Sequence, residues 1–332
     1  MKSDSIKVVT PNFKKRWSGV TSTIFSLLPL QSKQIEIVAV GPSLPADLPQ
    51  ISFMELLRLS AVKPRVWHAR RNLEMLAGLI LKHLFRKNLK LVFTSAAQRQ
   101  HSPYTRKLIS RMDVVIATSQ KSANYLEVPH AIIHHGIDTE IFKPTSNKIA
   151  LRSELNLPEG KLVGCFGRVR PQKGVDIFVD AMRKVCTEDP LAVGIICGQT
   201  TTEHRGFEEA LRARVADAGF SDRIIFLGTQ PSNRLPLLFA ALDIYVAPQR
   251  NEGFGLTPIE AMACGVPVIA TTAGAFEEMV LNGETGYIVE IEDIINMAER
   301  LVELLSDERR RKALAKASIE RVNQHFEIKG EA

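Results

Sequence analysis

The sequence predicts an α/β protein built from two doubly wound domains. Short apolar runs alternate with longer amphipathic stretches along the chain, which is the rhythm of βαβ units around parallel sheets. This rhythm occurs twice, with a change of character near residue 145. The length of 332 residues is comfortable for two such domains. We therefore predict a first domain over 1–145 and a second over 146–332, facing each other across a cleft. The last helix could pack back on the first domain.

Each domain is expected to contain a series of strands joined by helices. In the first half, apolar runs predict strands at 6–10, 35–40, 91–94, 114–118 and 131–134. Amphipathic patterns between them predict helices near 20–28, 72–85, 103–111 and 121–126. The run 143–147 (Lys-Pro-Thr-Ser-Asn) has the composition of a linker. Strands of the second half are predicted at 162–166, 193–197, 224–227, 244–247 and 268–270.

Composition limits the class of protein. The chain is 45% hydrophobic and 24% charged, a normal globular balance. No secretory leader is visible at its start, and no apolar run approaches the roughly 18–20 residues of a membrane span. The four cysteines stand singly, without zinc-ligand spacing, so we expect reduced, buried thiols. They are Cys165, Cys186, Cys197 and Cys264.

Charge is distributed unevenly along the chain. Residues 1–150 carry 22 Lys and Arg against 9 Asp and Glu, a balance of +13, whereas the remainder carries 21 against 27, a balance of −6. A basic half indicates an anionic partner: nucleic acid, an anionic membrane or a phosphorylated substrate. Charge alone does not choose among them.

The most informative segment follows the strand predicted at 244–247, and doubly wound sheets bind ligands at such strand ends. It reads Glu252, Gly253, Phe254, Gly255, Leu256, Thr257, Pro258, Ile259 and Glu260. Thr257 is the expected N-cap, Pro258 the first helical residue and Glu260 the other half of a capping box. Gly253 and Gly255 would also let backbone amides approach a ligand. Helix capping and ligand binding are compatible here.

A basic loop, 167–174, follows the strand predicted at 162–166. Arg168 and Lys173 stand at its mouth, where two cations could clamp a diphosphate through charge-assisted hydrogen bonds. A solvated basic loop is the alternative. The spacing does not match a P-loop.

Two weaker candidates lie in the first half. Gly19, within Trp17-Ser18-Gly19, precedes a predicted helix and could approach phosphates. His68 ends the apolar stretch of the Val66–Arg71 segment, and a single histidine is more often structural than catalytic.

Taken together, these segments resemble the retaining glycosyltransferases of family 4, which have the GT-B fold. The resemblance spans nearly the whole chain and includes the Gly-Arg-x4-Lys-Gly loop, the Glu-x7-Glu segment and the turn 282–287. The runs 67–70 and 248–255 look most similar to the bacterial lipopolysaccharide core mannosyltransferases. Ser18-Gly19 departs from the Gly-Gly pair that is common in the family, which weakens the inference for Gly19.

The resemblance implies a role for each candidate. Arg168 and Lys173 would neutralise the donor diphosphate in place of a metal, and no Asp-x-Asp motif occurs in the chain. Glu260 would bind the ribose, Glu252 and the 253–255 backbone the transferred sugar, and His68 would lie near that sugar. The implied catalytic residues are His68, Arg168, Lys173 and Glu252. The implied donor-binding residues are Gly19, Arg168, Lys173, Glu252, Gly253, Phe254, Gly255, Leu256, Thr257 and Glu260.

The expected activity is therefore transfer of a sugar, mannose from GDP-mannose, to a lipopolysaccharide core or related lipid-linked glycan, without a cofactor or metal. Another GT-B enzyme, such as a phosphorylase or a nucleotide-sugar epimerase, is an alternative. A non-catalytic binder of RNA or membrane is a second one. Aromatic residues make up only 6% of the chain and do not alternate with arginines in the basic half, which argues against nucleic acid as a partner.

We also expect the protein on the cytosolic face of the inner membrane, held there by the basic half. The apolar side chains Leu76, Leu79, Ile80 and Leu84 could form a lipid-facing stripe or simply pack on the sheet. The cations expected to face anionic lipid are Lys14, Lys15, Arg16, Lys82, Arg86, Lys87 and Lys90.

Overall fold

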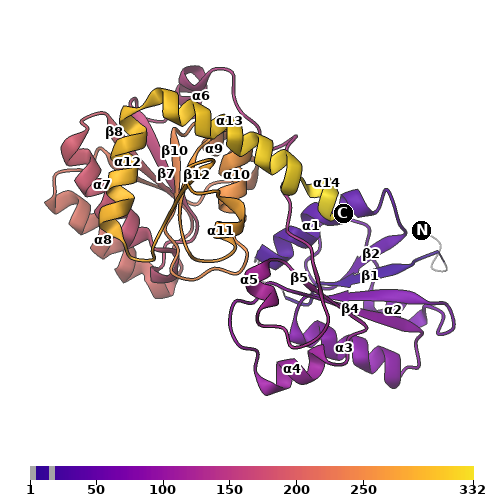
Figure 1. Ribbon diagram of the computed structural model, residues 1–332. Helices are drawn as coiled ribbons and strands as arrows, with labels where there is room; N and C mark the ends of the chain where they lie inside the picture. Colours follow the sequence, from indigo (N-terminus) through magenta and orange to yellow (C-terminus); the bar gives the residue numbers. More distant parts are fainter. Residues whose placement is uncertain (1–4, 15–18) are drawn as a thin grey trace. The chain divides into compact units, whose positions relative to one another are not determined.

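The computed structural model describes residues 5–14 and 19–332 and divides into two compact units (Figure 1). The first comprises Met1–His135 together with Ile328–Ala332, and the second comprises Gly136–Glu327. The chain leaves the first unit after His135, earlier than the change of character near residue 145. Its last helix, α14 (Ile328–Glu331), contacts α1 (Gly19–Gln31) within the first unit.

The first unit is a six-stranded parallel sheet in the order β2-β1-β3-β4-β5-β6. The strands are β1 (Val8–Pro11), β2 (Ile37–Val40), β3 (Arg65–Ala69), β4 (Leu89–Ser95), β5 (Val114–Ala117) and β6 (Ala131–Ile132). Besides α1 and α14, its helices are α2 (Phe53–Arg58), α3 (Asn72–His83), α4 (Pro103–Ile109) and α5 (Gln120–Ala123).

Both faces of this sheet are buried, as a doubly wound sheet requires. Neighbouring residues of a strand point to opposite faces. Val9 accordingly packs in the cluster that contains Met75 of α3, whereas Val8 packs in the cluster that contains Leu28 of α1.

β3 lies between β1 and β4 and was not among the predicted strands. The strand begins with Arg65 and contains His68, so its hydropathy is low. Arg65 is only 4% exposed, because its guanidinium donates to the carbonyl oxygens of Ile6 at 3.1 Å and Ser60 at 2.7 Å. The bond to Ile6 joins residues 59 positions apart, so local hydropathy cannot anticipate that this charge is buried.

The second unit is also a six-stranded parallel sheet, in the order β12-β11-β10-β7-β8-β9. The strands are β7 (Lys161–Phe166), β8 (Ala192–Cys197), β9 (Ile224–Gly228), β10 (Ile244–Ala247), β11 (Val268–Thr271) and β12 (Gly286–Val289). Its helices are α6 (Lys148–Glu154), α7 (Val175–Glu188), α8 (Arg205–Asp217), α9 (Leu235–Ala240), α10 (Thr257–Ala263), α11 (Phe276–Met279), α12 (Ile294–Ser306) and α13 (Glu308–His325). β12 was not among the predicted strands.

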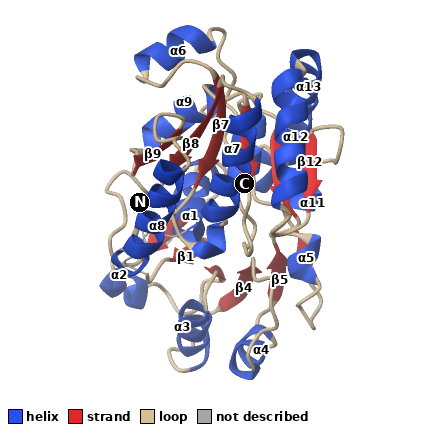
Figure 2. Cartoon of the chain, turned by 90° about the vertical axis from the view of Figure 1, so that its left-hand side faces the viewer, coloured by secondary structure: helices blue, strands red, loops and turns tan. Residues whose placement is uncertain are grey.

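Helices flank the strands of the second unit in Figure 2, and the buried residues form one core cluster on each face of the sheet. Ile195 of β8 packs in the cluster of Met262 from α10. Its neighbour Ile196 packs in the cluster of Phe178 from α7. The α/β, doubly wound class predicted from the sequence is therefore confirmed for each unit.

The cysteines match the expectation from composition, since all four are buried and free. Over residues 5–14 and 19–332, no helix combines the length and the apolar character needed to cross a bilayer.

Candidate functional site

The strand order of the second unit reverses between β7 and β10. The chain runs outward from β7 through β8 and β9, and then continues on the other side of β7 with β10, β11 and β12. β7 and β10 pair in parallel, with Ile244 opposite Val163. Doubly wound sheets bind ligands outside the carboxyl ends of the strands at such a reversal. The basic loop 167–174 and the segment 252–260 follow these two strands, so both motifs lie at this edge.

The two loops are in backbone contact at Gly174. Residues Pro171–Lys173 form a short 3-10 turn, and Gly174 then adopts a left-handed φ of 65°. A Cβ at this position would lie 1.8 Å from the carbonyl oxygen of Pro248. Glycine is therefore required here, both by the backbone conformation and by the approach of the second loop.

Lys173 and Glu252 form an ion pair across the reversal. The Lys173 Nζ donates to Oε2 of Glu252, and Oε1 accepts a hydrogen bond from the Gly253 amide at 3.1 Å. The two side chains are only 19% and 21% exposed, so solvent screens the pair less than an open surface pair. The residues assigned separately to diphosphate and to sugar are thus in direct contact. An ammonium has three N–H donors, so Lys173 can also donate to an arriving anion.

Arg250, which belongs to the run 248–255 but received no role from the sequence, joins the two loops. Its guanidinium makes two parallel hydrogen bonds of 2.8 Å to the carboxylate of Asp176, at the start of α7. Its Nε donates to Glu292 at 2.7 Å, and Nη1 also donates to the Pro171 carbonyl at 2.6 Å. The hydrogen bond with Asp176 is the main cause that raises the pKa of Arg250. Its carboxylate partners lie 74 and 42 residues away in sequence, so spacing gives no sign of them.

The turn 253–255 is shaped by packing against α11. Phe254 is 4% exposed. Gly255 has a left-handed φ of 86°, and a Cβ there would lie 2.4 Å from the Phe276 ring and 2.8 Å from Cγ of Glu252. The absence of a side chain at Gly255 therefore leaves room for Glu252 to reach Lys173.

The capping box predicted at Thr257 is wrong. α10 begins at Thr257 with Leu256 as its N-cap residue, and no side chain makes a capping hydrogen bond there. Because Thr257 is itself helical, its hydroxyl does not occupy the N-cap position from which it could accept the amide bond. Pro258 still lies in the first turn, where its missing N–H is tolerated.

Without a capping role, the Glu260 carboxyl makes no hydrogen bond or ion pair with any residue in the described part of the chain. The side chain retains part of its solvent exposure. Even so, desolvation by the protein around it raises the pKa of Glu260 to about 7. A carboxyl with unused oxygens near the strand reversal is suited to accept hydrogen bonds from ligand hydroxyls.

Arg168 is the second residue after the end of β7 and is half-buried. The Gly167 amide donates to the Cys197 carbonyl at 2.8 Å. The Val169 amide donates to the Gln199 carbonyl at 3.1 Å. These bonds tie both sides of Arg168 to the end of β8 and fix its backbone at the carboxyl edge of the sheet.

The first unit has its own reversal, because β2 lies on one side of β1 and β3 on the other. His68 is the fourth residue of β3, and its Nε2 lies 2.7 Å from Oγ1 of Thr94 on β4. Burial, followed by the charges of Arg70 and His135, lowers the pKa of His68 well below its ordinary value. Its imidazole is therefore neutral at neutral pH, a form that can donate one hydrogen bond and accept another.

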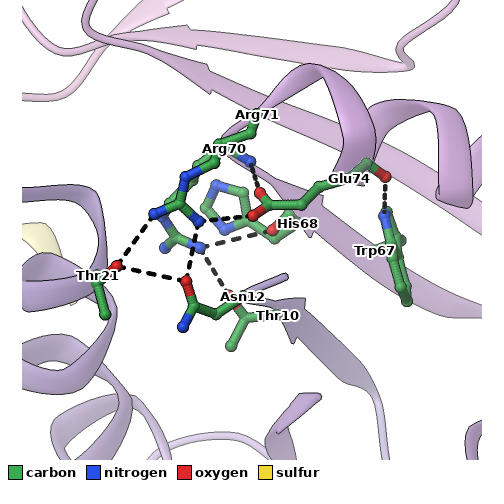
Figure 3. Close-up of polar contacts among 8 residues, drawn as sticks. All are labelled: Thr10, Asn12, Thr21, Trp67, His68, Arg70, Arg71 and Glu74. Atoms are coloured by element: carbon green, nitrogen blue, oxygen red, sulfur yellow. Dashed lines mark hydrogen bonds and ion pairs between the residues drawn. The ribbon is translucent and has the colours of Figure 1, made fainter. Parts of the chain in front are cut away.

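A network of polar side chains fixes the turn after β3 (Figure 3). Arg71 pairs with Glu74 at 2.7 Å and donates to Oδ1 of Asn12 at 2.9 Å. It also donates to Oγ1 of Thr21 at 3.1 Å. The second oxygen of Glu74 accepts from the Arg70 amide at 2.8 Å. Asn12, Thr21 and Glu74 are at most 3% exposed, and nothing in their local sequence had marked them.

Gly19 opens α1, where an added Cβ would have no atom of the described residues within 4 Å. Packing therefore does not explain the glycine. Its neighbours Trp17 and Ser18 lie outside the described residues. Gly19 and His68 belong to the first unit, whereas the other candidate residues belong to the second.

The sequence of this chain is similar to those of known glycosyl transferases. Residues 147–321 match the family model described as glycosyl transferases group 1. Over 98% of its length, the chain is 48% identical to the lipopolysaccharide core biosynthesis mannosyltransferase LpsB of Rhizobium meliloti (strain 1021), covering 95% of that protein. It is 45% identical to the corresponding enzyme LpcC of Rhizobium leguminosarum bv. viciae, with 98% and 94% of the two chains covered.

Solved structures are similar as well. HepE of Anabaena, crystallised with UDP and glucose, superposes with a TM-score of 0.85 at 20% identity, covering 97% of this chain and 96% of HepE. The C-terminal domain of LpcC from Francisella tularensis is 34% identical with a TM-score of 0.56, and covers 58% of this chain and 100% of that domain.

Proposed function

This chain belongs to the group 1 glycosyl transferases, and we propose that it transfers mannose from GDP-mannose to a lipopolysaccharide core or related lipid-linked glycan with retention of configuration. The predicted GT-B fold and glycosyltransferase class are confirmed. The choice of sugar and acceptor is carried by one observation, the 48% identity to LpsB over 98% of the chain. No comparable observation favours a phosphorylase, an epimerase or a non-catalytic binder.

In this proposal Lys173 and Arg168 bind the donor diphosphate. Both follow β7 at the strand reversal, and the backbone bonds on either side of Arg168 hold the loop in place. Lys173 would keep its contact with Glu252 while donating its other N–H groups to phosphate oxygens. The two cations would supply the charge that a metal ion supplies elsewhere, so we propose a metal-independent reaction.

The second segment would bind the remainder of the donor. Glu260, whose carboxyl has no partner among residues 5–14 and 19–332, would accept hydrogen bonds from the ribose hydroxyls. Glu252 and the backbone of 253–255 would bind the transferred sugar, with Leu256 and Thr257 completing the loop. On the first unit, neutral His68 would hydrogen-bond the sugar, and Gly19 would leave room for a phosphate group.

The reaction needs no separate protein base. The acceptor hydroxyl oxygen forms a bond to the anomeric carbon on the face from which the nucleotide departs, and the bond from that carbon to the phosphate oxygen breaks. The acceptor proton passes to the departing phosphate oxygen. Negative charge grows on the diphosphate during this step, so Arg168 and Lys173 stabilise the transition state more than the ground state.

A transfer assay tests the proposal. The purified chain would be incubated with GDP-mannose, UDP-glucose or UDP-galactose and a core oligosaccharide, and the product linkage would be read by NMR. We expect an α-mannoside from the α-linked donor. Transfer from a different nucleotide-sugar would overturn the donor assignment, and a β-linked product would overturn retention.

Membrane association requires one correction to the expected lipid-facing cations. Lys82 is half-buried and pairs with Asp113 at 2.8 Å, and half-buried Lys87 donates to the Leu57 carbonyl at 2.7 Å. Each of these two ammonium groups therefore already binds an oxygen of the protein, so it offers fewer free N–H groups to lipid than we expected. Lys15 and Arg16 lie outside the described residues.

The exposed residues of the loop after α3 support a peripheral location at the membrane better than the apolar residues of α3 do. Leu76 and Leu79 pack against the core, as the packing alternative held. Leu84 and Phe85 are 75% and 48% exposed and stand beside exposed Arg86. We propose that this loop contacts the cytosolic face of the inner membrane. Sedimentation with vesicles of rising anionic lipid content should show salt-sensitive binding, and binding indifferent to both lipid charge and salt would contradict it.

A further inference from the structure

Arg70 lies at the strand reversal of the first unit, and the proposed function assigns it no role. It follows β3 directly, at the carboxyl edge of the sheet, where the strand order reverses between β1 and β3. Its Nη1 donates to Oγ1 of Thr10 at 2.6 Å and lies 3.5 Å from the His68 carbonyl oxygen. Thr10 is 2% exposed, so the anchor of the guanidinium is buried. Figure 3 shows Arg70 beside Arg71, with both guanidinium groups facing the same polar cluster.

The two neighbouring arginines are used differently. Arg71 is ion-paired with Glu74 and hydrogen-bonded to side chains of two other segments. Arg70 makes no ion pair among the residues that the structure describes, and its Nε and Nη2 donate to none of them. Arg71 therefore connects separate segments of the first unit. In contrast, the edge of the Arg70 guanidinium that carries Nε and Nη2 is open to a ligand.

The carboxylates nearest to Arg70 are engaged elsewhere. Glu74 binds Arg71 and the Arg70 amide, and Glu331 of α14 binds Nδ1 of His135 at 2.7 Å. Burial lowers the pKa of Arg70 to about 10, although Glu331 and Glu74 oppose the shift, so the side chain remains charged at neutral pH. A charged, half-buried guanidinium that forms no ion pair among the described residues favours an anion that can replace its lost hydration.

We propose that Arg70 binds an anionic group of the acceptor glycan, a carboxylate or a phosphate, through its open guanidinium edge. Two parallel N–H groups match the two oxygens of either anion. The hydrogen bond that Nη1 donates to Thr10 fixes the other edge and thereby orients the fork. This inference rests on the proposed function for the identity of the acceptor, and it assigns to Arg70 the selection of acidic over neutral glycans.

The two chemical sources of the anion can be separated with three forms of one acceptor. They are a de-O-acylated lipopolysaccharide core oligosaccharide, the same oligosaccharide with its carboxyl groups reduced to alcohols, and the same oligosaccharide dephosphorylated with hydrofluoric acid. Binding of each to the full chain in the presence of GDP is measured by calorimetry, and transfer by initial rates. The variants are Arg70→Gln, Arg70→Lys and, as a matched control, Lys107→Gln on exposed α4.

Arg70→Gln should weaken binding of the native oligosaccharide about tenfold to a hundredfold, the range for charge-assisted hydrogen bonds. Arg70→Lys should recover part of the loss, because it restores charge without the fork. The loss should vanish on the one modified acceptor that lacks the recognised anion, since two changes that remove one interaction are not additive. Release of nucleoside diphosphate from the donor without acceptor should stay at the wild-type rate, and Lys107→Gln should match wild type throughout.

Any of four results would overturn the inference. The first two are unchanged acceptor binding in Arg70→Gln and equal loss on all three oligosaccharides. The others are an increase in donor KM that accounts for the whole effect and absence of oligosaccharide binding by the wild type. Anion-dependent binding without sugar transfer from any donor would instead reject the proposed function and leave the role of Arg70 standing.

Discussion

Replacing Glu260 by glutamine should stabilise the folded chain in alkaline solution. Burial raises the pKa of Glu260 from 4.5 to about 7. Between these values the folded chain keeps a proton that the unfolded chain has lost, so wild-type stability falls as pH rises through this window. Glutamine has no such proton. Its advantage should be absent below about pH 4 and reach about 1–3 kcal/mol at pH 8, a range that allows for screening of the partly exposed side chain.

The same substitution should weaken nucleotide binding, so its effect on binding is opposite in sign to its effect on stability. Ribose hydroxyls donate hydrogen bonds to the ionised carboxylate, so binding favours loss of the proton. If the pKa of Glu260 returns to 4.5 in the complex, wild-type affinity for GDP should be about thirtyfold lower at pH 5.5 than at pH 8. The glutamine variant should lose this component and retain only the pH dependence of the nucleotide phosphates.

Thermal unfolding and calorimetric titration with GDP, each at pH 5.5 and pH 8, measure both effects. Equal GDP affinity of variant and wild type at pH 8 would refute the ribose contact. A stability gain that does not change with pH would refute the raised pKa of Glu260. A loss of stability of about 1 kcal/mol at both pH values would indicate a helix-capping role after all.

The other predictions concern the loops at the strand reversal of the second unit. Arg168→Ala and Lys173→Ala should each reduce kcat/KM about tenfold to a hundredfold in steady-state assays while Tm changes little, because both lie on a loop. Activity should survive EDTA, and strict dependence on added Mg²⁺ would contradict the metal-independent mechanism. Arg250→Lys should keep the charge but break the paired bonds to Asp176, which should cost about 1–3 kcal/mol in urea unfolding. Gly174→Ala should destabilise by more than about 1 kcal/mol in the same assay, and an unchanged midpoint would argue against the contact between the loops.

Local patterns were sufficient to predict the sheets and the loops that end them. Buried parallel strands read as apolar runs, so β7 and β10 could be found within one residue of their bounds. Because ligand sites in such sheets lie at strand ends, the predicted strands also indicated that Lys173 and Glu252 lie near the site. Their direct ion pair did not, because it joins residues that are 79 positions apart.

The errors share a physical cause, which is the dependence of local structure on distant partners. β3 contains Arg65, whose charge is accommodated by carbonyl oxygens from two other segments. The start of α10 satisfied every local rule for a capping box at Thr257, yet the helix begins with that residue. Arg250 binds Asp176 of α7 and Arg71 binds Asn12 after β1, and charge spacing along the sequence does not reveal these distant partners.

The return of Ile328–Glu331 to the first unit has a consequence for synthesis on the ribosome. The hydrogen bond between His135 and Glu331 joins residues 196 positions apart, with the whole second unit between them. At the usual elongation rate of about 5–20 residues per second, His135 waits about 10–40 s for its partner to be made. The second unit is continuous in sequence and can fold as soon as it emerges. The first unit begins earlier but is completed last, so the nascent chain carries it unfinished until the final helix has been translated.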